Sequence, residues 1–214
     1  MDPSDKIPPL IESLVDNVRS KHYPKGQIIL YQGDTPTEVL VLRTGVIKLY
    51  DIDDQGNEKI LHLVKPHAIV PFAFFSGGDR PIQWFYTALT DCDVCVLPLD
   101  EILDRLSHDA ELTGYLMNWF SLEVHELLVR LSSLGKTNSH DKLKAALRFL
   151  GTFHSIRRRS GWRRVMFPVN HQLLADMTGI TRESTAMAMK DFQQDGLVRN
   201  PRQTILEIDL DKLD

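Results

Sequence analysis

Hydrophobic residues follow two different patterns along the chain. Between residues 23 and 99 they form short runs separated by glycine-containing segments, and runs of this length are typical of β-strands. The segment 53–57 holds Asp, Gly and Asn, which accept a positive φ, so we expect it to join two of the runs as a hairpin. Many short strands at this spacing predict an antiparallel roll or barrel. The expected strands cover residues 27–30, 39–42, 46–50, 59–64, 84–89 and 94–97.

From residue 100 onward the pattern of hydrophobic residues changes from a two-residue repeat to a seven-residue repeat. Apolar residues recur at alternating spacings of three and four, which places them on one seam of a long helix. They are Met117, Phe120, Val124, Leu127, Leu131 and Leu134. Other apolar residues between 112 and 119 flank this seam and can cover the roll. We expect the seam itself to pair with the same helix of a second copy; the alternative is that one chain buries both faces.

The remainder of the chain mixes short helices with hairpins. Gly135 ends the long helix, and a hinge at 136–139 leads to a helix over about 140–154. A basic hairpin around Gly161, two short helices and a hairpin over 197–208 with Asn200-Pro201 at its turn complete the pattern. This is the layout of a winged helix-turn-helix. The predicted fold is α+β: a β-roll sensor domain over 1–108, a dimerisation helix over 109–135 and a winged helix-turn-helix over 136–214.

Residues 170–192 have the pattern of two short helices that cross at a tight turn. Thr178-Gly179 supplies the turn, because glycine tolerates the left-handed conformation, and Thr181 is placed to cap the second helix. The expected buried positions are Leu173, Leu174 and Met177 in the first helix and Thr185, Ala188, Met189 and Phe192 in the second. The outward positions of the second helix are Arg182, Glu183, Ala186, Met187 and Lys190.

The outward face carries side chains suited to reading base edges in the major groove. Arginine donates two hydrogen bonds to guanine, and glutamate accepts one from the amino group of cytosine. We therefore predict base contacts from Arg182, Glu183, Ala186 and Met187. The alternative is an ordinary solvated helix face.

Charge is distributed unevenly along the chain. Residues 136–214 hold 14 basic and 9 acidic side chains, a net charge of +5, which leaves −9 for the rest of a chain whose total is −4. The positive part is the one able to meet phosphate. We predict phosphate contacts from Arg157, Arg158, Arg159, Arg163, Arg164, Thr181 and Lys190, the alternative for the arginines being a solvated loop.

Composition narrows the classes of protein to which the chain can belong. The 214 residues are 43% hydrophobic and 25% charged, with no long apolar run and no secretion-type leader at the start, so we expect a cytoplasmic protein without membrane contact. Two cysteines are too few for a disulfide framework. The sequence has no nucleophile elbow, HExxH helix or phosphate loop, so we expect no enzyme, no cofactor and no metal.

The chain resembles the CRP/FNR family of bacterial transcription regulators. The resemblance rests on Gly26, Gly33, Gly45 and Gly56 in the roll, on the long helix, and on the segments 181–184 and 196–198. It implies a cyclic-nucleotide-binding-like roll that senses a ligand, and a homodimer on a near-palindromic site in double-stranded DNA. It also implies that Arg182 and Glu183 match the family's base-reading pair. RNA polymerase and a small-molecule effector are further candidate partners.

The chain departs from the family pattern at two places. Met187 stands where many members carry a second arginine, and it cannot donate to guanine. The roll has Pro71-Phe72-Ala73 and Ile82-Gln83-Trp84 where cyclic-nucleotide binders carry a glutamate and a phosphate-binding arginine. We therefore predict no binding of cyclic AMP. The candidate effector pocket comprises Phe72, Phe74, Arg80, Ile82 and Trp84, the alternative being a core filled by its own aromatic side chains.

Two minor alternatives concern the roll. His62 and His67 are candidate haem ligands, although single histidines beside a strand are more often structural. Cys92 and Cys95 form a CxxC pattern, but residues three apart on a strand point to opposite faces, which argues against a redox pair.

The competing function for the whole chain is a ligand-sensing module that acts through a protein partner and binds DNA without specificity.

Overall fold

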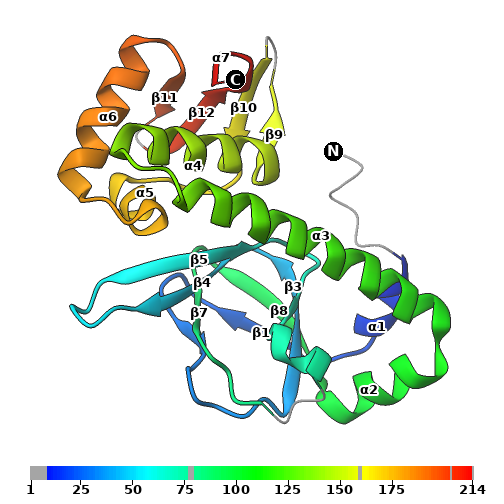
Figure 1. Ribbon diagram of the computed structural model, residues 1–214. Helices are drawn as coiled ribbons and strands as arrows, with labels where there is room; N and C mark the ends of the chain where they lie inside the picture. The colour runs from blue at the N-terminus through cyan, green and yellow to red at the C-terminus, as the bar shows by residue number, and fades with distance from the viewer. Residues whose placement is uncertain (1–8, 77–79, 159–160, 203, 214) are drawn as a thin grey trace. The chain divides into compact units, whose positions relative to one another are not determined.

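The structure, a computed structural model, describes residues 9–76, 80–158, 161–202 and 204–213 (Figure 1). Two compact units make up the chain: residues up to Asp51 with Ile60–Ser121, and Ile52–Lys59 with Leu122–Asp214. Helix α3 (Ala110–Leu134) is continuous through the boundary between them. None of the helices in the described ranges is both long enough and apolar enough to cross a bilayer.

Two four-stranded antiparallel sheets form the roll of the first unit, which confirms the predicted class. One has the order β1-β8-β3-β6 and the other β2-β7-β4-β5. Their bounds are β1 (Ser20–Tyr23), β2 (Ile28–Leu30), β3 (Glu38–Thr44), β4 (Ile47–Ile52), β5 (Glu58–Val64), β6 (Ile69–Val70), β7 (Phe85–Ala88) and β8 (Cys92–Pro98). A 3-10 helix, η2 (Phe72–Ser76), follows β6. The sequence reasoning missed β1 and β6, the strands at the two edges of the first sheet.

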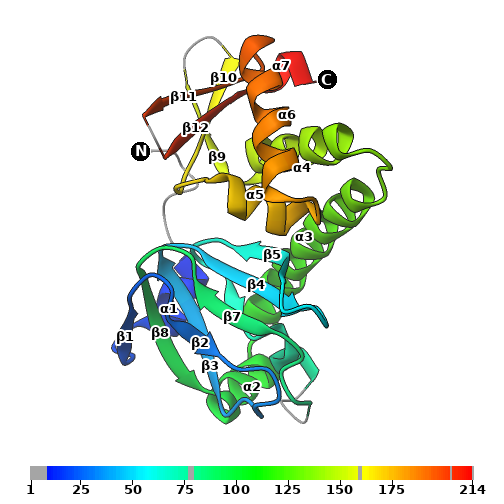
Figure 2. The same ribbon diagram turned by 90° about the vertical axis from the view of Figure 1, so that its left-hand side faces the viewer.

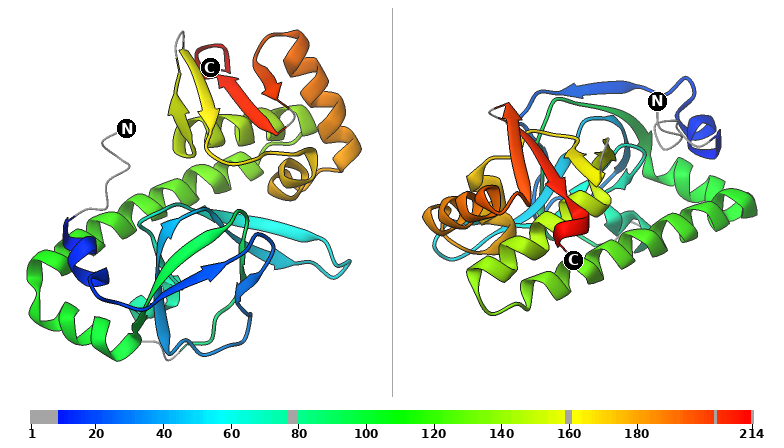
Figure 3. Two further views of the ribbon diagram at one scale, coloured as in Figure 1. Left: turned by 180° about the vertical axis from the view of Figure 1, so that it is seen from behind. Right: turned by 90° about the horizontal axis from the view of Figure 1, so that it is seen from above.

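Strand β3 is buried on both faces, which explains its uninterrupted apolar run. Leu40 and Leu42 belong to the cluster between the two sheets, whereas Val39 and Val41 belong to a second cluster on the other face. That second cluster is completed by three helices, α1 (Pro9–Val15), α2 (Leu99–His108) and the start of α3. Figure 3 shows α1 and α2 beside the roll. Alternation between the faces also separates Cys92 from Cys95, since each joins a different cluster.

Gly45 is the roll glycine at which the backbone leaves no room for a side chain. Its φ is +91°, and a Cβ built there would lie 2.2 Å from the main-chain oxygen of Asp91. The turn between β3 and β4 therefore approaches the segment before β8 more closely than any residue with a side chain permits.

The second unit is a winged helix-turn-helix, as predicted. Its sheet has the order β11-β12-β10-β9, and α4 packs against β10 and β12 (Figure 1). Asn138 caps α4 through its side-chain oxygen, which accepts a hydrogen bond of 2.7 Å from the amide of Asp141. The elements are α4 (Ser139–Phe153), β9 (Ser155–Arg157), β10 (Trp162–Val165), α5 (His171–Thr178), α6 (Arg182–Gln194), β11 (Val198–Arg202), β12 (Ile205–Asp209) and α7 (Leu210–Leu213).

The turn predicted at Asn200-Pro201 is wrong. These residues lie inside β11, which continues to Arg202, and β12 begins at Ile205. The pairing register shifts between Arg199 and Arg202. A proline cannot donate a hydrogen bond to the neighbouring strand, so a strand tolerates it at such an irregularity.

Candidate nucleic-acid interface

Helices α5 and α6 are positioned by local signals at their ends. Gly179 ends α5 in the left-handed conformation, with φ of +67°, and its amide donates to the carbonyl of Ala175 at 2.8 Å. The Thr181 hydroxyl accepts a hydrogen bond of 3.1 Å from the amide of Ser184 and so caps α6. Both roles were predicted. The result is a sharp crossing between the two helices (Figure 2).

One side of α6 is anchored in the core of the unit. Thr185, Ala188, Met189 and Phe192 are all buried, as the sequence predicted. The Thr185 hydroxyl donates to the carbonyl of Thr181 at 3.0 Å, and the ring of Phe192 lies 4.2 Å from that of His140 on α4. These contacts determine which side chains of α6 remain outside.

The opposite side of α6 is presented to solvent. Arg182, Glu183, Met187 and Lys190 are exposed, and Ala186 is half-buried. Met187 has 71% of its surface accessible, the largest value among the exposed large hydrophobic residues of the described ranges. Arg182 and Glu183 occupy the first turn, where the helix begins. A guanidinium, a carboxylate and a thioether are thus presented side by side on one exposed helix face.

The outer face of the C-terminal sheet carries a row of three charged residues on neighbouring strands. Glu207 of β12 is the register partner of Arg164 on β10 and of Arg199 on β11. Its two carboxylate oxygens accept from Arg164 Nη2 and from Arg199 Nε, each at 2.7 Å. Burial by itself would raise the pKa of Glu207, but the hydrogen bonds from Arg199 and Arg164 outweigh it and hold that pKa below its ordinary value.

Three of the predicted phosphate-binding arginines line one cavity beside this row. Arg157, Arg158 and Arg164 line a cavity of about 700 Å³ together with Arg199, Pro201 and Glu207. Arg163 instead pairs in register with the buried Ile208, on the alternate row of the sheet, and Arg159 lies outside the described residues. Arg199, whose guanidinium lies 4.1 Å from the centre of the Trp162 ring, was missed by sequence reasoning. The hairpin predicted with its turn at Asn200-Pro201 places Arg199 opposite Arg202, so the register that pairs Arg199 with Glu207 could not be read from the sequence.

A buried arginine connects α3 to the helix-turn-helix. Arg130 is 3% exposed, and its guanidinium donates a hydrogen bond to the main-chain carbonyl of Met177, in the last turn of α5. Burial lowers the pKa of Arg130 to about 10, so the side chain keeps its charge at neutral pH. Sequence reasoning assigned Arg130 no role, because a single arginine between apolar positions carries no signal of its own.

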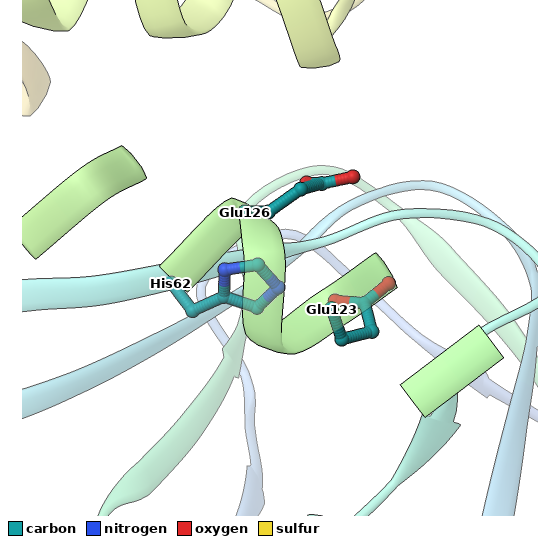
Figure 4. A group of neighbouring side chains, drawn as sticks. All are labelled: His62, Glu123 and Glu126. Carbon is teal, nitrogen blue, oxygen red and sulfur yellow. The ribbon is translucent and has the colours of Figure 1, made fainter. Parts of the chain in front are cut away.

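The two sides of α3 are opposite in character. Glu123, Glu126 and Arg130 follow one another at spacings of three and four, so they share one face of the helix, and all three are buried. Figure 4 shows the two carboxylates on α3. On the other side of the helix the exposed large hydrophobic residues are Met117, Val124, Leu128 and Leu131. Leu134 is exposed in the last turn, and Leu122 is exposed next to the charged face. Phe120 and Leu127 of the predicted seam are half-buried within the chain.

The roll contains a cavity of about 590 Å³ that includes most of the predicted effector pocket. Phe72, Arg80, Ile82 and Trp84 line it, together with Tyr86. Burial raises the pKa of the Tyr86 hydroxyl to about 12, so this group is neutral at physiological pH. Phe74 does not line the cavity: it is fully buried in the cluster between the first sheet and the helices, so its assignment to the pocket is wrong.

The roll also contains the two cysteines and two histidines that are candidates for redox or haem chemistry. Cys92 and Cys95 are both free and buried, and they face opposite sides of β8, as predicted for a strand. Burial is the largest influence on Cys92 and raises the pKa of its thiol, which disfavours the reactive thiolate. His62 is 1% exposed, with its ring 6.0 Å from that of Phe72, and His67 adopts a φ of +74° after β5.

Comparison with known proteins agrees with both units. The family model described as "Cyclic nucleotide-binding domain" matches residues 20–109, and "Crp-like helix-turn-helix domain" matches 142–214. The fumarate and nitrate reduction regulatory protein of Vibrio cholerae is 30% identical over 177 residues, which cover 82% of this chain and 69% of that protein. The anaerobic regulatory protein of Haemophilus influenzae is 26% identical over 186 residues, covering 86% and 71%.

Solved structures share the fold. A transcriptional regulator of the CRP/FNR family from Thermus thermophilus has a TM-score of 0.70 at 23% identity, covering 91% of this chain and 96% of that one. FixK2 from Bradyrhizobium japonicum has a TM-score of 0.75 at 15% identity, covering 92% and 95%. At these identities the likeness concerns the fold alone. Together with the relative from Vibrio cholerae and the two matching domains, the observations establish that the chain belongs to the CRP/FNR family of transcription regulators.

Proposed function

We propose that this transcription regulator binds a near-palindromic site in double-stranded DNA as a homodimer, reading each half-site with α6. The observation that carries the proposal is the exposed pair Arg182 and Glu183 in the first turn of a helix whose other side is locked in the core. In helix-turn-helix proteins the N-terminal residues of the second helix contact base edges in the major groove.

Each residue of this face has a distinct role in the proposal. Arg182 donates two hydrogen bonds to a guanine, and Glu183 accepts one from the amino group of a cytosine. Ala186 has a small side chain, which lets the helix approach the bases closely. Met187 lies beside these residues as the apolar member of the base-reading set.

Phosphate contacts are proposed from two groups of residues. Thr181 and Lys190 flank the base-reading residues on α6 and are exposed. Among the arginines, we retain Arg157, Arg158, Arg163 and Arg164 as candidates, together with Arg159, which lies outside the described residues. Glu207 supports the set, because it holds Arg164 in a defined position while part of the Arg164 side chain stays exposed. Such contacts orient a protein on DNA without reading its sequence.

The dimer is proposed from the exposed apolar stripe of α3. Leu131, Leu128 and Met117 are 65%, 59% and 57% exposed, on a helix whose buried side carries charged residues. A stripe of this kind at coiled-coil spacing is stabilised when a second copy covers it. We extend the seam to Leu128 and retain Met117, Phe120, Val124, Leu127, Leu131 and Leu134 as its predicted members. We likewise retain a sensor domain over 1–108, a dimerisation helix over 109–135 and a DNA-binding domain over 136–214.

The roll is proposed to respond to something other than cyclic AMP. Among the described residues that line its cavity, Arg80 is the single cation, and the other lining residues include Phe72, Ile82 and Trp84. A cyclic phosphate would therefore lack the buried ionic and ribose contacts that offset its desolvation. A small-molecule effector that fits this largely aromatic cavity is a candidate partner, and RNA polymerase is a candidate partner of the DNA-bound regulator.

Selection of bound sequences from a random duplex library, with the full chain and no added ligand, tests the proposal. We expect recovery of a near-palindrome whose half-sites contain a G·C pair that depends on Arg182. Weak, sequence-blind binding would instead support a ligand-sensing module that acts through a protein partner. The same selection repeated with Arg182→Ala separates these outcomes.

A further inference from the structure

Met187 is the most exposed large hydrophobic residue that the described part of the chain contains, and it lies on the face of α6 proposed to read DNA. Its neighbour of the same type, Met189, is 2% exposed, so α6 directs one methionine into the core and the other into solvent. A thioether cannot donate a hydrogen bond to guanine. An apolar side chain at this place needs an apolar partner in the groove.

The major groove offers one apolar group, the 5-methyl group of thymine, which side-chain methyl groups and other apolar side chains contact in direct readout. We propose that Met187 packs against a thymine methyl group and thereby specifies a T·A pair in each half-site. This inference rests on the proposed function, because it requires α6 to lie in the major groove.

The geometry of α6 places this pair close to the one read by Glu183. Met187 follows Glu183 by four residues, which is about 6 Å along the helix axis and about 40° around it. Successive bases of one strand are about 3.4 Å apart. Met187 therefore reaches a base pair within about two steps of the pair contacted by Glu183, on the same side of the helix.

Deoxyuridine provides the test, because it differs from thymidine only by the missing methyl group. The site selected with the full chain is resynthesised with each thymine replaced in turn, symmetrically in both half-sites, and binding is measured by fluorescence anisotropy. Loss of one buried methyl group weakens binding about fourfold per half-site, so the symmetric replacement weakens it about sixteenfold at one position. In the wild-type protein we expect one such position within two steps of the Glu183 contact.

Variants then assign that methyl group to Met187. Met187→Ala should bind the thymine and deoxyuridine sites equally, and Met187→Leu should keep most of the discrimination, since leucine is also apolar. Met187→Arg should change the preferred pair at that position to G·C. Met166→Ala is the matched control: this methionine is 46% exposed but lies outside α6, and its loss should leave the discrimination unchanged.

Three results would overturn the inference. A selected site without a methyl-sensitive thymine near the Glu183 contact excludes a methyl contact. A methyl-sensitive thymine that remains sensitive in Met187→Ala assigns the contact to another residue. Failure of the library to yield any sequence defeats the proposed function first, before deoxyuridine is used, so the two failures are distinguishable. Because Met187 is exposed, its variants should fold, which circular dichroism of the full chain checks.

Discussion

The Arg130 guanidinium donates a hydrogen bond to the carbonyl of Met177, and this contact ties the second half of α3 to the end of α5. The carbonyls of the last helical turn have no partner within their own helix and carry partial negative charge. A buried cation at that place satisfies one of them. The contact therefore holds the first helix of the helix-turn-helix against the helix that carries the proposed dimer seam.

Replacing Arg130 by leucine should lower the free energy of unfolding by about 2 kcal/mol. The substitution removes a hydrogen bond from a charged donor, and the buried carbonyl of Met177 loses the donor that Arg130 supplied. Urea denaturation of the full chain measures the change. Arg105→Leu is the control, because Arg105 is a half-buried arginine on α2 with a long hydrogen bond of 3.4 Å to the carbonyl of Ser13 and a solvent-accessible pair with Glu101 that should contribute less than 1 kcal/mol. Equal effects of the two substitutions would contradict the role given to Arg130.

Arg182→Ala should weaken binding to the selected site by about 1–3 kcal/mol and relax the preference at one base pair in each half-site. The reason is the loss of two hydrogen bonds to a guanine. Competition binding against sites altered at single positions measures both effects. Arg105→Ala removes the same charge from the first unit, and it should leave the sequence preference intact. An Arg182→Ala protein with unchanged preference would show that the reading face is assigned incorrectly.

Leu131→Glu should dissociate the proposed dimer. Leu131 is 65% exposed on the apolar stripe, and a carboxylate buried there against a second copy would lack a partner, at a cost of several kcal/mol. Sedimentation velocity should report a shift to monomer, with DNA binding reduced about a hundredfold or more. Leu122→Glu is the matched control: Leu122 is 57% exposed but lies about 180° around α3 from Leu131. If both variants stay dimeric, the seam lies elsewhere.

Glu207→Gln should lower stability at neutral pH by about 1–2 kcal/mol, because the two arginines lose a charged acceptor. The effect should depend on pH. The pKa of Glu207 is held below its ordinary value of 4.5, so the folded state keeps the carboxylate ionised where the unfolded state binds a proton. The stabilisation is therefore complete above about pH 4.5 and is lost as the pH falls through the folded-state value.

Thermal unfolding of wild type and Glu207→Gln between pH 3 and 8 measures this dependence. The difference between the two proteins should be constant at neutral pH and shrink in acid. A difference that grows in acid would mean that Glu207 is destabilised by its burial rather than stabilised by Arg164 and Arg199.

Cyclic AMP should show no saturable binding at micromolar concentration in isothermal titration calorimetry. Phe72 and Ile82 line the cavity together with Arg80, and this one exposed arginine does not offset the desolvation of a phosphate. Arg80→Ala provides the internal check: a weak heat signal that survives this substitution would not come from phosphate recognition. Tight binding by the wild type would contradict the assignment of the roll.

Local signals in the sequence were sufficient for the elements that carry the proposed reading face. Gly179 ends α5, Thr181 caps α6, and the apolar spacing of α6 places Phe192 inside and Arg182 outside. Each of these depends on residues within one or two helical turns, so it can be read from neighbouring positions alone. The same holds for the sequence of roll, long helix and winged helix-turn-helix.

Tertiary structure alone decided the contacts between residues distant in the chain. The pairing of Arg164 and Arg199 with Glu207 depends on the register of three strands, and a register shift of one residue would place Glu207 on the other face. The link from Arg130 to Met177 requires two helices to pack side by side. The position of Phe74 in the core instead of the cavity likewise depends on which elements surround η2. Sequence spacing specifies the face of an element, whereas its partner is specified only when the whole chain has packed.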